Sequence, residues 1–130
     1  MWRRQVGLGV RAKAKDGGSR SMSYLHWSWI RHVAREEGVA LPQSGGQTDS
    51  LSSVEAKQLA TALRVRADKI RKGTAPRDAT SFVQRADKEW FHEDQAGEDG
   101  GTVRADFDEP GRMEDVADFF ESSGGVELRY

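Results

Sequence analysis

Apolar side chains recur with helical spacing in four segments of the chain, and residues that start or end helices bound each segment. The first helix is expected over residues 24–37, with Ser23 as its N-cap and Gly38 after its last turn. Its apolar positions form a wide arc on one side of the helix. They are Leu25, Trp27, Trp29, Ile30, Val33 and Ala34. Burial of this whole arc is the favoured interpretation, with Trp27 as a partner-facing anchor the alternative.

The second helix has the clearest start signal. Ser52 and Glu55 have the spacing of a capping box, in which each residue satisfies the backbone N–H of the other. Gly73 follows the last turn. One face of this helix carries apolar side chains at helical spacing: Ala56, Leu59, Ala60, Leu63, Ala67 and Ile70.

Two further helices are expected toward the C-terminus. The third begins near Asp78 or Thr80, and its apolar stripe is Phe82, Val83, Ala86 and Trp90. Pro110 opens the fourth, because proline at the first helical position lacks only an N–H that would have no partner there. The inward face of the fourth helix is Met113, Val116, Ala117, Phe119 and Phe120.

Two short segments have the alternation of apolar and polar residues that is typical of strands. Residues 101–107 place Val103, Ala105 and Phe107 on one face, and residues 126–130 follow a glycine pair. The predicted fold class is therefore α+β and mostly helical, with three to four amphipathic helices and a small two-stranded sheet near the C-terminus. Helices of this kind can support such a small sheet.

Residues 1–21 show no sustained period and end in glycines and serines. We expect them to form a flexible basic arm outside the core. A translated upstream segment, a nucleic-acid arm and a targeting peptide remain open as explanations for it. Residues 22–130 are expected to form a single globular domain, as a chain of 130 residues suggests.

Charge is strongly segregated along the chain, although the net charge is only −1. Residues 1–21 carry six basic side chains against Asp16. Residues 57–88 carry nine basic and three acidic side chains, and residues 89–121 carry twelve acidic and two basic ones. Segregation of this kind bears on partners and solubility rather than on the fold.

Motifs for catalysis or cofactor binding are missing from the sequence. The chain has no cysteine, which excludes disulfides and thiolate zinc sites. It has neither a Gly-x-Ser-x-Gly turn nor a phosphate-binding Gly-Lys-Ser/Thr loop. His26, His32 and His92 are scattered, so no metal site is expected. We therefore predict a protein that is not an enzyme, binds no cofactor and lies in the cytoplasm, with no segment apolar enough for a membrane.

The preferred functional hypothesis is an interaction or regulatory protein that binds a protein partner. The acidic segment is its proposed contact surface, because acidic side chains speed encounter with a cationic partner. The proposed contact residues are Glu98, Asp99, Asp106, Asp108 and Glu109. Simple solubility is an equally good explanation for these acids.

Nucleic-acid binding is the alternative hypothesis. Lys57, Arg64 and Arg71 recur every seven residues along one flank of the second helix, where they would contact phosphates together with the basic arm. Ordinary ion pairs within the helix explain the same charges. The oligomeric state does not follow from the sequence.

Parts of the chain from Met22 onward resemble a loose set of small uncharacterised bacterial and phage proteins. The shared stretches are "VAREEG", "ALPQSGG", "LSSVEAKQLATAL" and "DFFESSGGVEL". The aromatic-rich segment that usually precedes the second helix is missing here. The resemblance implies a mostly helical fold and no known activity.

Overall fold

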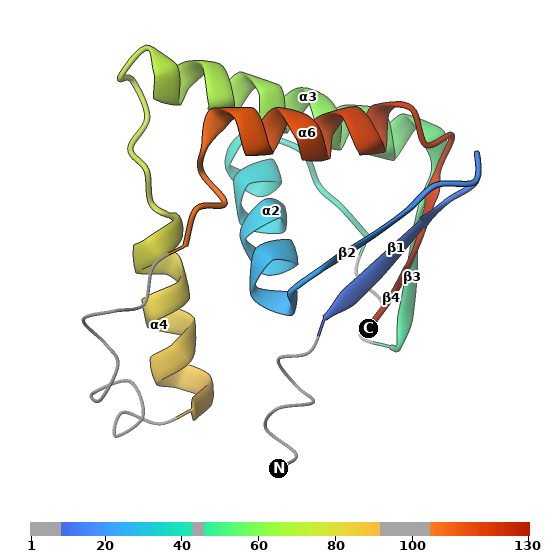
Figure 1. Ribbon diagram of the computed structural model, residues 1–130, viewed down its shortest axis with the longest axis horizontal. Coiled ribbons are helices and arrows are strands. Elements are labelled where there is room, and N and C mark those ends of the chain that lie inside the picture. Colours follow the sequence, from blue (N-terminus) through green and yellow to red (C-terminus); the bar gives the residue numbers. More distant parts are fainter. Residues whose placement is uncertain (1–8, 43–45, 92–104) are drawn as a thin grey trace.

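The computed structural model describes residues 9–42, 46–91 and 105–130, and it contains one four-stranded antiparallel sheet with helices on one of its faces (Figure 1). The strand order is β2-β1-β4-β3. The strands are β1 (Val10–Ala14), β2 (Ser19–Met22), β3 (Thr48–Leu51) and β4 (Val126–Arg129). The helices are α2 (Tyr24–Glu36), α3 (Ser53–Arg71), α4 (Ala79–Phe91) and α6 (Pro110–Glu121).

The prediction of a two-stranded sheet near the C-terminus is wrong. The terminal strand exists as β4, but it pairs with β1 on one side and β3 on the other. Residues 105–107 belong to no strand, and residues 101–104 lie outside the described part of the chain. The partners of β4 therefore come from the N-terminal and middle parts of the sequence.

The prediction of a flexible arm over residues 1–21 is wrong for residues 10–21, because they form a β-hairpin that belongs to the sheet. Strand β1 lies between β2 and β4 in the sheet. Its turn at the end includes Gly17 with φ of 107°, a left-handed conformation that glycine adopts without strain. The Ala14 N–H donates to the Gly18 carbonyl over 2.8 Å and closes the hairpin. Glycines that suggested a linker thus belong to a tight turn.

The sequence did not predict strand β1, because the side chains that it buries are small. Val10, Ala12 and Ala14 are buried, whereas the alternate side chains of Arg11 and Lys13 are exposed. Alanine and lysine are poor strand formers. Buried and exposed side chains alternate regularly in residues 10–14. This alternation indicates a strand clearly only when its pairing with Val126–Arg129 is known.

The helix boundaries follow the caps that the sequence predicts. The Ser23 side chain accepts a hydrogen bond from the His26 N–H over 3.0 Å. Both bonds of the capping box are present: the Ser52 N–H donates to Glu55 Oε1 over 2.8 Å, and the Glu55 N–H donates to Ser52 Oγ over 3.1 Å. Pro110 lies at the start of α6 as expected.

The core lies between the sheet and the helices, and both tryptophans of α2 belong to it. Trp27 is 1% exposed and Trp29 is fully buried, so Trp27 belongs to the core; of the predicted apolar arc, only Leu25 is half-buried. The Trp27 ring lies 6.1 Å from the Phe120 ring of α6, centroid to centroid. Helices α3 and α6 pack side by side over this core (Figure 1). No helix in the described part of the chain is long and apolar enough to cross a membrane.

Candidate functional site

The basic flank of α3 and the acidic face of α6 lie against each other. Arg64 forms ion pairs of 2.5 Å with both Asp118 and Glu121. Arg71 binds both carboxylate oxygens of Glu114, one of them over 2.8 Å. The hydrogen bond from Arg71 lowers the pKa of Glu114, which keeps this pair charged at neutral pH. Charges that are separated in the sequence therefore face each other across the helix interface.

Two of the three cations proposed to contact nucleic acid are engaged in these pairs. Arg64 and Arg71 face α6, whereas Lys57 is exposed near the start of α3. Lys57 borders a shallow groove together with the exposed side chains of Val54 and Val65. The three side chains therefore do not form one free basic surface.

The acidic residues proposed to contact a partner differ in their surroundings. Asp106 is exposed and pairs with Arg112, and Glu109 pairs with Arg77 over 2.6 Å. Asp108 is only 5% exposed, and its Oδ2 accepts a hydrogen bond from the Ala79 N–H over 3.1 Å. Glu98 and Asp99 lie outside the described residues. Asp108 thus holds the first turn of α4.

Replacement of Asp108 by alanine is expected to destabilise the protein by about 1–2 kcal/mol, because the Ala79 N–H loses its acceptor at a helix start. Replacement of Asp106 should cost less, about 0.2–1 kcal/mol, since its ion pair is exposed to solvent. Urea unfolding of both variants measures the difference. Equal losses would contradict a structural role specific to Asp108.

The exposed face of the sheet presents a polar row that crosses all four strands. Ser21, Arg11, Arg129 and Thr48 are consecutive cross-strand neighbours in the sheet register. All four are exposed, because the alternate positions of each strand point into the core. We call these four residues the arginine row. It contains two cations and two hydroxyls and no acidic group.

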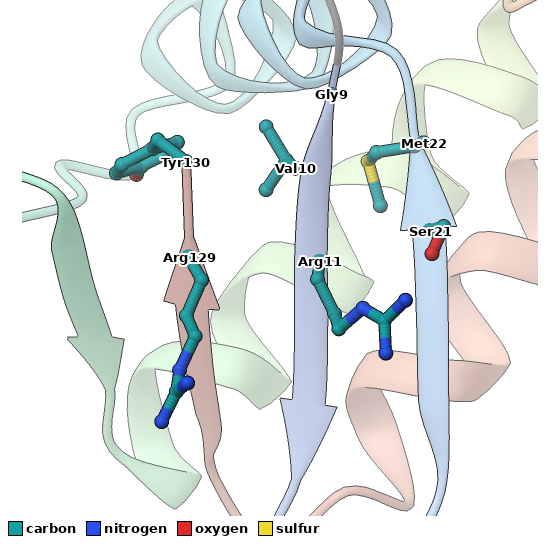
Figure 2. Close-up of a pocket in the computed structure, with 7 residues that line it drawn as sticks. All are labelled: Gly9, Val10, Arg11, Ser21, Met22, Arg129 and Tyr130. Atoms are coloured by element: carbon teal, nitrogen blue, oxygen red, sulfur yellow. The ribbon is translucent and has the colours of Figure 1, made fainter.

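Arg11 and Arg129 form the centre of the arginine row. They project from neighbouring strands on the side away from the helices (Figure 2). Arg129 Nε lies 3.3 Å from Glu127, and no acidic group of the described residues lies within ion-pair distance of Arg11. An open hollow of about 860 Å³ adjoins the row and is bordered by Gly9 and Tyr130.

Tyr130 is fixed at the rim of this hollow. Its hydroxyl donates to Asp49 Oδ2 over 2.8 Å. Burial and the hydrogen bond to Asp49 raise the pKa of Tyr130 to about 12, and the phenol therefore stays neutral. The phenol of Tyr130 thus adds no negative charge beside the arginines.

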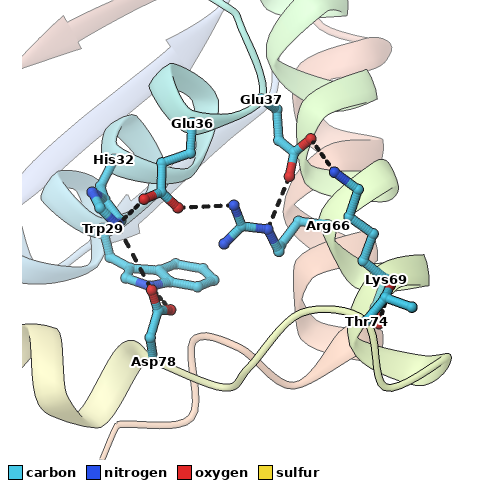
Figure 3. A network of polar contacts seen from close by, with 8 residues as sticks. All are labelled: Trp29, His32, Glu36, Glu37, Arg66, Lys69, Thr74 and Asp78. Carbon is cyan, nitrogen blue, oxygen red and sulfur yellow. Dashed lines mark hydrogen bonds and ion pairs between the residues drawn. The ribbon is translucent and has the colours of Figure 1, made fainter.

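A second polar centre lies between α2, α3 and the start of α4 (Figure 3). Arg66 of α3 is 7% exposed and donates over 2.9 Å to both Glu36 and Glu37. Lys69 also donates to Glu37 over 2.9 Å. Burial opposes ionisation of Glu37, but the hydrogen bonds from Lys69 and Arg66 outweigh it and lower its pKa. This network joins the end of α2 to α3.

His32 lies at the edge of the same network. Its Nε2 is 3.5 Å from Glu36 Oε2 and 3.7 Å from Asp78 Oδ2. The prediction of no metal site rests on the three scattered histidines and not on carboxylates beside His32. His32 and Glu36 are four residues apart on α2, a spacing that places both on one helix face. Asp78 gives no such signal, because it joins them only through packing of α4 against α2.

Comparison of the chain with family models, curated proteins and solved structures finds no match. The functional argument therefore rests on the arginine row, on the ion pairs between α3 and α6, and on the polar network between α2, α3 and the start of α4.

Proposed function

We propose that the protein is a non-enzymatic binding module of the cytoplasm that contacts the phosphate backbone of nucleic acid through the arginine row. The observation that carries this proposal is the cross-strand pair of Arg11 and Arg129. Like charges directly opposite each other destabilise a sheet. A bound phosphate removes that repulsion, because it lies between two guanidinium groups and accepts hydrogen bonds from both.

The neighbours of the two arginines support a phosphate ligand. Ser21 and Thr48 flank the pair, and hydroxyl side chains are common donors to phosphate oxygens. Neighbouring strands are about 4.8 Å apart, so the row spans about 14 Å and has room for more than one phosphate of a chain. Lys13 adds a further cation on the same face, opposite Glu127.

Nucleic acid stays the proposed ligand, as in the alternative hypothesis from the sequence, but the proposed contact surface is the sheet instead of the flank of α3. The basic residues of the N-terminal segment contribute through β1, whereas Arg64 and Arg71 are paired with α6. A protein partner at the acidic segment stays a prediction. Of its described members, Asp106 and Glu109 each pair with an intramolecular cation and Asp108 is buried, whereas Arg11 of the arginine row has no acidic group of the described residues within ion-pair distance.

The proposal is tested with fluorescently labelled oligonucleotides of mixed sequence, single-stranded and duplex. Fluorescence anisotropy at 50 mM and 200 mM salt gives the affinity and its salt dependence. We expect the double variant Arg11→Gln/Arg129→Gln to bind at least tenfold more weakly, since each charge-assisted hydrogen bond contributes about 1.5–3 kcal/mol. The slope of log affinity against log salt should fall by roughly 0.7–0.9 for each phosphate that the variant no longer neutralises.

A matched control removes the same charge elsewhere. Arg35→Gln/Arg85→Gln changes two exposed arginines outside the sheet, and it should bind as the wild type does. Binding that depends instead on Lys57, Arg64 and Arg71 would favour the flank of α3. Equal binding of polyglutamate would point to an acidic protein partner, and no oligonucleotide binding at 50 mM salt would refute the proposal.

A further inference from the structure

We propose that His32, Glu36 and Asp78 bind a first-row transition-metal ion of the zinc class, with one coordination position left to water. Each residue offers one ligand atom, and these three atoms lie within 4.8 Å of one another. Zinc accepts both imidazole nitrogen and carboxylate oxygen as ligands, and open zinc sites keep three protein ligands and one position for water. The site is independent of the arginine row, because its residues come from α2 and the residue before α4.

The two distances from His32 are close to those between ligands of one ion and longer than direct hydrogen bonds, and the two carboxylate oxygens lie within 4.8 Å of each other. Ligand atoms at about 2.0–2.2 Å from a tetrahedral ion are about 3.3–3.6 Å from each other. His32 Nε2 lies 3.5 Å from Glu36 Oε2 and 3.7 Å from Asp78 Oδ2. Hydrogen bonds from nitrogen to oxygen are normally about 2.7–3.2 Å long. Small side-chain movements therefore suffice to close the site around an ion.

The surrounding donors already orient both carboxylates. Asp78 Oδ1 accepts a hydrogen bond from the indole N–H of Trp29 over 3.0 Å, which leaves Oδ2 toward His32. Glu36 Oε1 accepts from Arg66, which leaves Oε2 toward His32 (Figure 3). The ring of Phe82 packs 5.3 Å from the His32 ring. Outer partners of this kind fix ligands for a metal.

The local charge also permits a cation. Arg66 pairs with Glu36 over 2.9 Å, and its guanidinium divides its charge between Glu36 and Glu37, with which it also pairs over 2.9 Å. The three proposed ligands are partly accessible, with side chains of His32 and Asp78 each 25% exposed. An ion therefore has an entry path from solvent and keeps a face toward water.

The experiment uses the full chain after treatment with a chelator. Zinc is titrated by calorimetry at pH 7.5, and cobalt is titrated by visible absorption, which reports four-coordinate geometry. We expect one saturable site, a cobalt spectrum of tetrahedral type and a raised melting temperature with zinc.

Three variants and one control decide the assignment. His32→Gln, Glu36→Gln and Asp78→Asn should each weaken binding, with His32→Gln removing the cobalt spectrum. Asp68→Asn changes an exposed acid of α3 and should bind zinc as the wild type does. Melting of each variant in chelator shows that it is folded. Absence of a saturable site, or unchanged affinity in His32→Gln, would overturn the proposal.

Discussion

Replacement of Ala12 by aspartate is expected to destabilise the protein by about 3–5 kcal/mol, because it places an unpaired carboxylate in the core. Ala12 is fully buried in the central strand β1, opposite Leu128 of β4. The loss is a large part of the roughly 5–15 kcal/mol that stabilises a typical domain. Urea unfolding followed by circular dichroism measures it.

The matched control places the same carboxylate on the other face of the sheet. Ser21 of β2 is exposed and lies opposite Arg11, so Ser21→Asp introduces an acid beside a cation. We expect a change of less than about 1 kcal/mol for this variant. If Ala12→Asp were as stable as Ser21→Asp, residues 10–14 would not belong to the core, and an N-terminal arm would be the correct description.

Acidification is expected to destabilise the protein through His26. This side chain is 3% exposed and lies flat on Phe107, with ring centroids 4.2 Å apart. Burial, together with the charges of Arg112 and Arg20, lowers the pKa of His26 to about 4 from its usual 6.5. The unfolded chain therefore binds a proton below pH 6.5 that the folded chain does not bind until about pH 4. Stability falls as pH falls through this window.

The size of this effect follows from the shift in pKa. By pH 4.5 the contribution of His26 is a loss of about 2–3 kcal/mol relative to pH 7.5. His26→Phe keeps an aromatic ring over Phe107 and removes the titration. Free energies of unfolding at pH 7.5, 5.5 and 4.5 should decline less in this variant than in the wild type. Parallel declines would show that His26 titrates normally in the folded protein.

Helix starts and ends could be predicted because their signals act over a few residues. Ser23 and Ser52 each accept a hydrogen bond from a backbone N–H of the first turn, and Pro110 has no N–H that would need a partner. The structure confirms the helices that these residues open. The apolar arcs were equally local, since side chains three and four residues apart share a helix face. The buried tryptophans of α2 follow from this spacing.

The candidate sites followed from the sequence only in part. His32 and Glu36 have a helical spacing that the sequence shows, but Asp78 completes the cluster through packing between helices. Arg11 is visible as a basic residue, yet its neighbour in the sheet is Arg129 at the opposite end of the chain. The sequence does not predict that Asp78 lies beside His32 or that Arg129 lies beside Arg11, because contact between distant segments depends on burial of the whole core.

The sequence by itself determined the helices of the described residues, the caps Ser23 and Ser52, the terminal strand and the buried face of α2. Only the tertiary structure decided the sheet, since β1 is a strand by virtue of pairing with β2 and β4 rather than by the propensity of its alanines and lysines. It also decided the meaning of the segregated charge. Arg64 and Arg71 meet Asp118, Glu121 and Glu114 across the interface of α3 and α6. The physical reason is range: capping and helical spacing act within a few residues, whereas strand pairing and ion pairs between helices require segments that the folded core brings together.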